Sequence, residues 1–328
     1  MFYNQTILVT GGTGSWGYEL VRQLLTYQPK EIRIFSRNES NQFIMKQEFD
    51  NNPKLHFIIG DIKESDALQE ACTGVDYVFH LAALKHVPVC EDQPLEALKS
   101  NVTGTQNVIN TAIHCGVKRV VYISTDKASS PSNFYGLTKN MGERLIIHAN
   151  TLNTKTKFVC IRGGNVLGTN GSVIHVFKKQ IREKGKIGIT DLNMTRFFLT
   201  LEDAIKMVFK AAFESIGGEI FVMKMPTCKI IDLAEVLIEA SGRTDVTVEE
   251  LGIRPGEKIH ELLFSEYESP TTISYDDEYY VILPSIHIPG LKEHYADYKL
   301  VNLVSYNSSQ GLMNKQQIKE MLEKGGFI

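Results

Sequence analysis

The sequence has little that would mark a membrane or nucleic-acid-binding protein. No run approaches the roughly 18–20 uncharged apolar residues that a bilayer-spanning helix needs. Its 35 basic and 38 acidic residues are interspersed and give a formal net charge of −3, so no basic block is present to attract nucleic acid or an anionic lipid surface. We therefore expect no membrane attachment and no nucleic-acid partner.

Cysteine is also scarce. The five cysteines form no C-x-x-C pair, their number is odd, and the N-terminus lacks a signal-peptide pattern. These features predict a cytoplasmic protein with reduced thiols. The nine histidines show no metal-ligand spacing, so no metal site is expected.

Short β-rich runs alternate with helical patterns through the first half of the chain. Uniformly apolar strands separated by helices indicate a parallel sheet covered on both faces, which is a Rossmann-type, doubly wound α/β fold. Amphipathic stretches between the strands include Tyr18–Leu25 and Glu96–Cys115. The predicted strands are Thr6–Thr10, Glu31–Phe35, Leu55–Ile59, Asp76–His80, Arg119–Ser124 and Lys157–Arg162.

The second half is less regular and predicts a smaller, mixed lobe. We expect residues 1–166 to form a dinucleotide-binding domain, with its sheet completed by part of 195–225. Residues 167–328 are expected to form mainly a substrate-binding lobe that ends in a helix. The elements predicted there are the helices Ser172–Lys184, Leu201–Phe213, Asp232–Ala240 and Asn314–Lys324, and the strand Glu219–Met223.

A glycine-rich turn, Thr10–Gly17 (TGGTGSWG), follows the first strand and opens the first helix. Glycines let the backbone turn tightly and approach a pyrophosphate, and the helix N-terminus offers N–H groups to it. The strand before and the helix after make this a predicted dinucleotide site. Its candidate residues are Gly11, Thr13, Gly14, Ser15, Trp16 and Gly17.

The residues after the second strand bear on which dinucleotide binds. NAD sites usually carry Asp or Glu there, but this chain has Ser36 and Arg37, whose hydroxyl and guanidinium suit the 2′-phosphate of NADP. Asp61, after the third strand, could accept a hydrogen bond from the adenine amino group. The small residues of Leu81-Ala82-Ala83 would let the chain pass close to the cofactor.

The candidate catalytic residues follow the fifth strand. Tyr135 and Lys139 are spaced i, i+4 on a predicted helix and so share one face. A nearby ammonium lowers the pKa of a phenol from about 10, and the phenolate can then remove a hydroxyl proton while hydride leaves the same carbon. This context predicts an oxidoreductase step.

Over essentially its whole length the chain resembles the extended short-chain dehydrogenases/reductases. Within them it is similar to the soluble, inverting UDP-N-acetylglucosamine 4,6-dehydratases, which begin pseudaminic acid synthesis for flagellin glycosylation. The motifs NVTGT (Asn101–Thr105) and NFYGLTK (Asn133–Lys139) mark the superfamily. The motifs typical of the dehydratases are AALKHVP (Ala82–Pro88), STDKA (Ser124–Ala128), MTRFF (Met194–Phe198) and GIRPGEK (Gly252–Lys258).

The resemblance implies further site residues. Additional cofactor contacts would come from Ile62, Lys85, Asn101, Ser124 and Val166, besides Tyr135 and Lys139. Lys85 and Asn165 would also lie near the sugar. The remaining substrate contacts would be Thr125, Val173, Thr195, Arg254 and Glu257, the last three towards UDP. The resemblance also implies a homo-oligomer, a hexamer.

The Asp126-Lys127 pair separates this group from its relatives, since retaining dehydratases carry Asp-Glu at this point. The resemblance implies that Tyr135 takes the 4-hydroxyl proton as hydride passes to NADP⁺. Lys127, its pKa lowered by burial and by cations such as Lys85, would remove the C5 proton. Protonated Asp126 would help the C6 hydroxyl leave. Hydride returning to C6, with protonation of C5 from the opposite face, would complete an inverting cycle.

Three alternatives stay open. The family usually has an aromatic residue where this chain has Gly163, and its loss could loosen the sugar pocket so that the 4-keto-5,6-ene intermediate is released. A UDP-hexose 4-epimerase would use the same Tyr135/Lys139 pair without dehydration. A non-catalytic NADPH sensor would need neither that pair nor Asp126 and Lys127.

Overall fold

The computed structural model describes residues 2–152, 155–169 and 171–328. The six predicted strands of the first half all form, each within one residue of its expected ends, and pair in parallel in the order β3-β2-β1-β4-β5-β6. This arrangement confirms the doubly wound fold. The strands are β1 (Thr6–Thr10), β2 (Glu31–Ser36), β3 (Leu55–Ile59), β4 (Tyr77–His80), β5 (Arg119–Thr125) and β6 (Lys157–Gly163).

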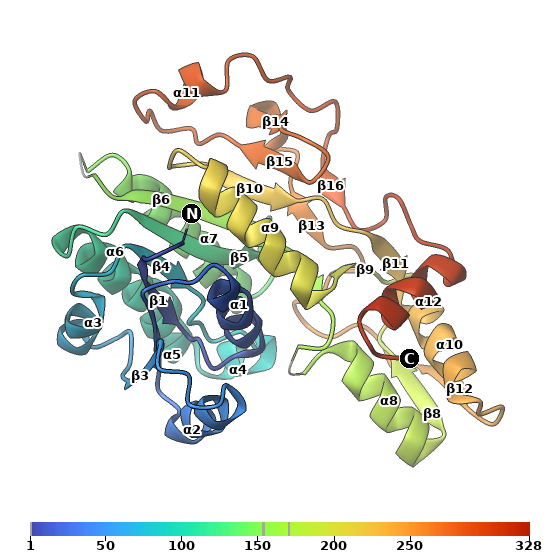
Figure 1. Ribbon diagram of the computed structural model, residues 1–328. Helices are drawn as coiled ribbons and strands as arrows, with labels where there is room; N and C mark the ends of the chain where they lie inside the picture. Colours follow the sequence, from blue (N-terminus) through green and yellow to red (C-terminus); the bar gives the residue numbers. More distant parts are fainter. Residues whose placement is uncertain (1, 153–154, 170) are drawn as a thin grey trace.

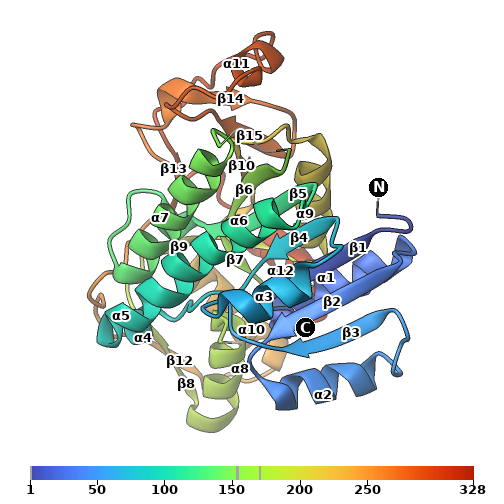
Figure 2. The same cartoon turned by 90° about the vertical axis from the view of Figure 1, so that its left-hand side faces the viewer.

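Helices cover both faces of this sheet (Figures 1 and 2). The helices α1 (Ser15–Thr26) and α9 (Leu201–Glu214) pack together on one face. On the other face lie α3 (Ser65–Cys72), α6 (Gly104–His114) and α7 (Phe134–Ala149). The remaining helices of this half are α2 (Glu39–Glu48), α4 (Val87–Asp92) and α5 (Pro94–Leu98).

The stretch Glu96–Cys115, expected to be one amphipathic segment, is interrupted. A π-helical turn at Lys99–Thr103 lies between α5 and α6. Its side chain at Asn101 is buried and turned toward the preceding loop, which it holds by hydrogen bonds to the main chain of Leu84.

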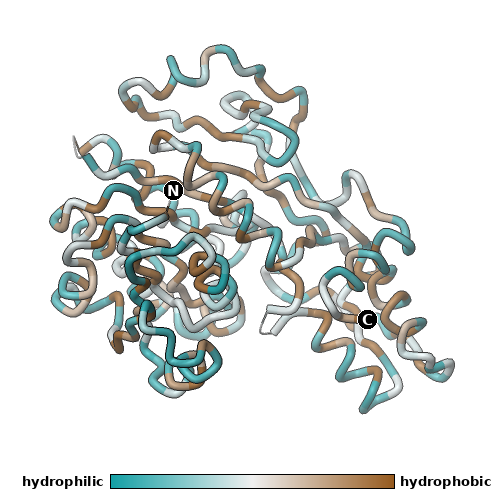
Figure 3. The backbone as a smooth tube through the Cα atoms, in the orientation of Figure 1, coloured by the Kyte–Doolittle hydropathy of each residue, from teal (hydrophilic) through white to brown (hydrophobic). Residues whose placement is uncertain are grey.

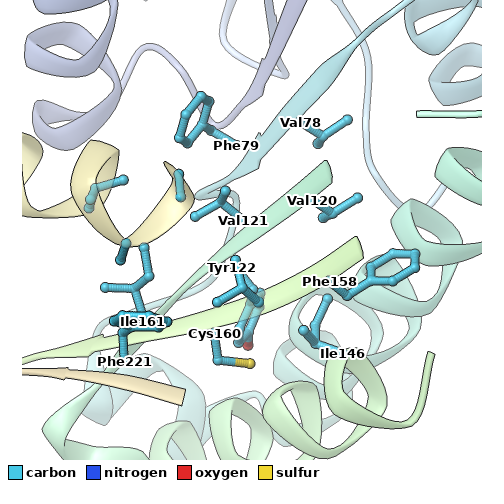
Figure 4. Packing of buried hydrophobic residues seen from close by; sticks show 14 of the residues in the cluster. Val78, Phe79, Val120, Val121, Tyr122, Ile146, Phe158, Cys160, Ile161 and Phe221 are labelled. Atoms are coloured by element: carbon cyan, nitrogen blue, oxygen red, sulfur yellow. The ribbon is translucent and has the colours of Figure 1, made fainter. Parts of the chain in front are cut away.

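The core explains why the strands are apolar throughout. Successive side chains of a strand point to opposite faces, and here helices bury both faces. In Figure 4, Phe79 and Val121 lie on one side of β4 and β5, whereas Val78 and Val120 lie on the other, toward Ile146 of α7. Figure 3, which colours the backbone by hydropathy, shows hydrophobic segments in the strands and hydrophilic ones on the outer loops.

Three strands from the second half extend the sheet beyond β6. The expected continuation within 195–225 falls on β10 (Ile220–Met223), which pairs in parallel with β6. Next comes β15 (Tyr279–Ile282), antiparallel to β10, and then β14 (Thr272–Ser274), antiparallel to β15. The sequence analysis did not predict these two strands. In contrast, β9 (Thr195–Leu199) leaves the large sheet and pairs with β7 (Asn165–Val166) and β11 (Thr227–Lys229).

The smaller lobe has a core of its own. Its apolar cluster joins α8 (Val173–Lys184), α10 (Ile230–Ser241) and α12 (Lys315–Lys324), and these helices lie together in Figure 1. In the described part of the chain, every helix is too short or too polar to cross a membrane. The other elements are β8 (Lys186–Ile189), β12 (Thr247–Glu250), β13 (Leu262–Phe264), α11 (Leu291–His294) and β16 (Tyr306–Asn307).

Candidate active site

A cleft of about 540 Å³ lies between the large sheet and the smaller lobe. It collects side chains from the carboxyl ends of the parallel strands, where open α/β sheets bind their ligands. A larger hollow of about 690 Å³ lies at the outer strand β3 and contains none of the predicted site residues. The predicted residues that line the cleft are Trp16, Lys85, Thr125, Lys127, Tyr135, Asn165, Val166, Val173, Arg254 and Glu257.

The glycine-rich turn has the close packing that a pyrophosphate site requires. Gly11 has a φ of +70°, and a Cβ there would lie 2.8 Å from the Cα of Ala82. At Gly17 a Cβ would lie 2.4 Å from the Cα of Gly12. Gly14 caps α1 without a side-chain hydrogen bond, and the first turn carries no acidic residue. The N-terminus of α1 therefore suits an anion.

The residues expected at the adenosine end lie together. The Ser36 hydroxyl lies 3.3 Å from the Thr13 hydroxyl and accepts a 3.0 Å hydrogen bond from Gln42, a residue that the sequence did not single out. Arg37 Nη1 lies 3.7 Å from Asp61 Oδ2, with its side chain more than half exposed. A hydroxyl and a reachable guanidinium at this position fit a ribose 2′-phosphate.

Three residues that were expected near the cofactor are buried and do not line the cleft. The side-chain amide of Asn101 accepts a hydrogen bond from the Leu84 N–H and donates one to the Leu84 carbonyl. It also donates to the Thr138 hydroxyl at 2.9 Å, so Asn101 holds the loop after β4 against α7. Ile62 packs on Gly104, where a Cβ would lie 2.6 Å from its Cδ1. The Ser124 hydroxyl is buried and has no hydrogen-bond partner among the described residues.

Tyr135 and Lys139 lie one turn apart on α7, which Asn133 caps by accepting a 2.9 Å hydrogen bond from the Gly136 N–H. The Lys139 ammonium donates to the Ile123 carbonyl at 2.7 Å and lies 3.9 Å from the centre of the Tyr122 ring. Burial lowers the pKa of Lys139 to about 7.

The expected lowering of the Tyr135 pKa by Lys139 does not occur. Burial raises the pKa of Tyr135 to about 12, and the cation that opposes this rise is Lys127. The reason is geometric, since the Lys139 ammonium is directed to a main-chain carbonyl and an aromatic ring.

Asp126 and Lys127 lie on a 3-10 turn that follows β5. Lys127 Nζ lies 3.0 Å from Asp126 Oδ1, which also accepts a 2.7 Å hydrogen bond from Thr125 Oγ1. The other Asp126 oxygen is buried and has no partner in the part of the chain that the structure describes. Asp126 is 1% exposed and, unlike Thr125 and Lys127 on either side of it, does not line the cleft.

The expected lowering of the Lys127 pKa is wrong for this structure. Burial does disfavour its ammonium, but Asp126 and Glu261 outweigh burial and raise the pKa of Lys127 above its usual value. Glu261 Oε1 lies 3.5 Å from Lys127 Nζ. Proximity to two buried carboxylates therefore keeps the proton on Lys127.

Thr195, expected to face UDP, points away from the cleft. It is 1% exposed, and its hydroxyl lies 2.8 Å from His260 Nδ1 and 2.7 Å from the Ser308 hydroxyl. Its neighbour Arg196 lines the cleft instead. Adjacent residues of a strand point in opposite directions. The prediction from the motif MTRFF therefore identified a strand that borders the cleft, but the side chain that faces the cleft is that of Arg196 and not that of Thr195.

The loop that contains GIRPGEK is docked on the start of α7, the helix that carries Tyr135 and Lys139. The Gly256 carbonyl accepts hydrogen bonds from the Ser132 hydroxyl at 2.9 Å and from the Asn133 amide at 3.0 Å. Lys258 Nζ donates to the Ser129 carbonyl at 2.9 Å. The contacts hold Arg254 and Glu257 of this loop at the cleft wall.

Gly163 does not line the cleft. A Cβ there would lie 3.1 Å from the sulfur of Met223, so a side chain at this position would point toward β10. The next residue, Gly164, lines the cleft and donates its N–H to the sulfur of Met225 at 3.0 Å. Asn170, further along the same segment, lies outside the described residues.

The fold and this arrangement of residues define an extended short-chain dehydrogenase/reductase. The chain belongs to the polysaccharide biosynthesis protein family, whose sequence profile matches residues 7–283.

The relatives of this chain include a dehydratase and an epimerase. The chain is 44% identical over 290 residues to a UDP-N-acetylglucosamine 4,6-dehydratase (inverting) of Campylobacter jejuni, covering 87% of this chain and 85% of the relative. It is 39% identical over 335 residues to a UDP-glucose 4-epimerase of Rickettsia felis, covering 98% and 96%. Among solved structures, Pen from Bacillus thuringiensis superimposes with a TM-score of 0.91 at 39% identity, covering 98% of this chain and 99% of Pen.

Proposed function

We propose that this protein is an NADP-dependent UDP-N-acetylglucosamine 4,6-dehydratase that inverts C5. The observation that carries the proposal is the Asp126–Lys127 pair, 3.0 Å apart at the end of β5 and next to Tyr135. The similarity to the Campylobacter dehydratase supports the same reaction.

NADP, when bound along the glycine-rich turn, supplies a reversible acceptor for the hydride of C4. Tyr135 takes the proton of the 4-hydroxyl, and the resulting ketone makes the C5 proton acidic. A phenol whose pKa burial raises to about 12 is a strong base once ionised. Lys127, the cation that opposes this rise, favours the phenolate.

Asp126 and Lys127 then perform the elimination. The resting site keeps the proton on Lys127, so the elimination requires that one proton pass from Lys127 Nζ to Asp126 across their 3.0 Å contact, against the raised pKa of Lys127. This transfer yields a neutral amine and a neutral acid together. The amine removes the C5 proton, the C5–H electron pair forms the C5–C6 double bond, and the C6 hydroxyl leaves as water with the proton of Asp126. A site with one shared proton thus provides the base and the acid at once.

A UDP-hexose 4-epimerase is the second candidate, favoured by the similarity to the Rickettsia protein. Epimerisation conserves every atom of the sugar and requires no proton transfer at C5. The pair Asp126 and Lys127 would then have no chemical task, which is why we place this candidate second.

The test is proton NMR of the purified protein with UDP-N-acetylglucosamine in D₂O. A 6-deoxy-4-keto product with deuterium at an inverted C5 is the expected result. Accumulation of a 5,6-ene would retain dehydration but remove the returning hydride step. Unchanged substrate, or a 4-epimer of equal mass, would refute the proposal.

Four further points belong to the proposal. NADP is preferred because Ser36 and Arg37 stand where NAD sites usually carry an acid, and the preference is tested by titrating both dinucleotides. A role in pseudaminic acid synthesis for flagellin, a cytoplasmic location and a hexameric assembly follow from the resemblance. Mass photometry of the native protein tests the assembly.

A further inference from the structure

Glu261 is a buried carboxylate that none of the recognised motifs contains. It lies three residues after GIRPGEK, is 3% exposed and lines the cleft. Its Oε1 atom lies 3.5 Å from Lys127 Nζ and 3.8 Å from Arg196 Nε. Its Oε2 atom is buried and has no hydrogen-bond partner among residues 2–152, 155–169 and 171–328. A buried carboxylate is costly unless a specific charge holds it, so this position calls for an explanation.

The backbone of Glu261 is fixed from two sides. Its N–H donates to the Ser308 hydroxyl at 2.9 Å, and its carbonyl accepts from the Ser308 N–H at 2.9 Å. The same serine hydroxyl lies 2.7 Å from the Thr195 hydroxyl, which also contacts His260. The buried hydroxyl of Thr195 thus belongs to the support of Glu261. A carboxylate on so rigid a base can aim another side chain.

We propose that Glu261 is a positioning residue that holds the Lys127 ammonium between two carboxylates and sets the pH range of the elimination. This inference rests on the proposed function. With Asp126 as its sole partner, Lys127 would be free to turn about that one contact. The second carboxylate fixes the direction of Nζ, as the third group of a catalytic triad orients its base.

The other charges around Lys127 define what removal of Glu261 would do. Asp126 on its own turn and Glu261 before β13 favour the ammonium, whereas Arg196 of β9 opposes it. The charge of Lys127 in turn acts to lower the pKa of Lys258 and that of Tyr135. Loss of the negative charge of Glu261 lowers the pKa of Lys127, since the ammonium loses a neighbouring anion. The limb of the pH profile that Lys127 sets therefore moves to lower pH.

The experiment compares Glu261→Gln with the wild type at saturating UDP-N-acetylglucosamine, with dehydration followed by NMR across the pH range. We expect the limb that Lys127 sets to move to lower pH by roughly one unit or more. The rate at the optimum should fall about 10- to 100-fold, because a base displaced by about 1 Å costs that much. The KM should stay within about threefold, because in this proposal Glu261 acts through Lys127. The isotope effect of C5-deuterated substrate should rise as C5–H cleavage becomes slower.

Two further variants make the comparison specific. Glu261→Asp keeps the charge and should return the pH profile toward that of the wild type. Glu266→Gln makes the same chemical change at an exposed position five residues on and should leave rate and profile unchanged.

Each outcome has a defined meaning. A Glu261→Gln profile that coincides with the wild-type profile overturns the inference, even if the rate falls, because a purely structural loss does not move pKa values. If Glu261→Gln fails to fold by circular dichroism, the isotope effect of Glu261→Asp decides, and an unchanged value overturns the inference. A wild-type protein that releases no water from the sugar refutes the proposed function instead.

Discussion

Arg162 is fully buried, and all its donor nitrogens are engaged. Its guanidinium makes two hydrogen bonds to Glu143 of α7, at 3.0 and 2.6 Å, and two to Glu268, at 3.2 and 3.0 Å. It also donates to the Leu263 carbonyl at 2.9 Å. Arg162 on β6 thereby connects the catalytic helix with the segment that follows β13. We predict that Arg162→Met is strongly destabilising.

The magnitude follows from what the substitution leaves behind. Removal of one partner of a buried ion pair typically costs about 3–5 kcal/mol, because an uncompensated charge stays in the interior. Here Glu143 is left buried, whereas Glu268 is partly accessible and can be hydrated. One orphaned carboxylate therefore dominates, and we expect a loss of about 3–5 kcal/mol in the free energy of unfolding. Glu143→Gln in addition should recover part of it, since a neutral amide replaces that carboxylate.

The assay is guanidinium chloride unfolding followed by circular dichroism. Lys186→Met is the matched control, because Lys186 and Glu249 form an exposed pair whose loss should cost less than about 1 kcal/mol. If Arg162→Met shifts the midpoint no more than this control does, the buried network contributes little and the reasoning is refuted. A changed slope of the transition would instead mean that the two unfolding reactions are not comparable.

Three more results are expected. Tyr135→Phe should abolish hydride transfer, seen in a single turnover as loss of the transient cofactor reduction at 340 nm, while cofactor binding by fluorescence is retained. Arg37→Ala should weaken NADP binding about 10- to 100-fold and NAD binding little, because one charge-assisted contact to a 2′-phosphate is lost; equal losses for both would contradict the assignment. Because the pKa of Lys139 is about 7 in the fold but about 10.4 in an unfolded chain, the unfolded state binds the extra proton between these values. Stability should therefore rise with pH over that range, and Lys139→Met should flatten this rise in unfolding curves taken from pH 7 to 10.

The predictable part of the fold has a physical reason. The strands β1–β6 are apolar on both faces, so short runs such as Thr6–Thr10 stand out in the sequence. The strands β14 and β15 lie in a polar, Tyr-rich segment, and their place in the sheet depends on pairing with β10, which no local pattern encodes. A long-range partner decided these elements.

The site divides in the same way. The glycine spacing and the Tyr135/Lys139 pair are local patterns, so they could be predicted from the sequence. Glu261 is 134 positions away from Lys127 in the sequence, and only the fold brings the two side chains together. The protonation of Lys127 could not be predicted for the same reason, because its sign depends on that distant carboxylate. Arg196 could have been found from the sequence. Side chains alternate between the two faces of a strand, so on β9 either Thr195 or Arg196 could have faced the cleft.

The docking of Gly256 has a consequence for how such proteins can be recombined. The side chain of Asn133 caps α7 and also donates a hydrogen bond to Gly256 in the loop that carries Arg254. One side chain therefore connects the first domain with the smaller lobe. A smaller lobe grafted from a relative would need a loop that satisfies the same asparagine. The two lobes are therefore not interchangeable modules, and a change of sugar specificity by lobe exchange has to preserve this joint or rebuild both of its sides.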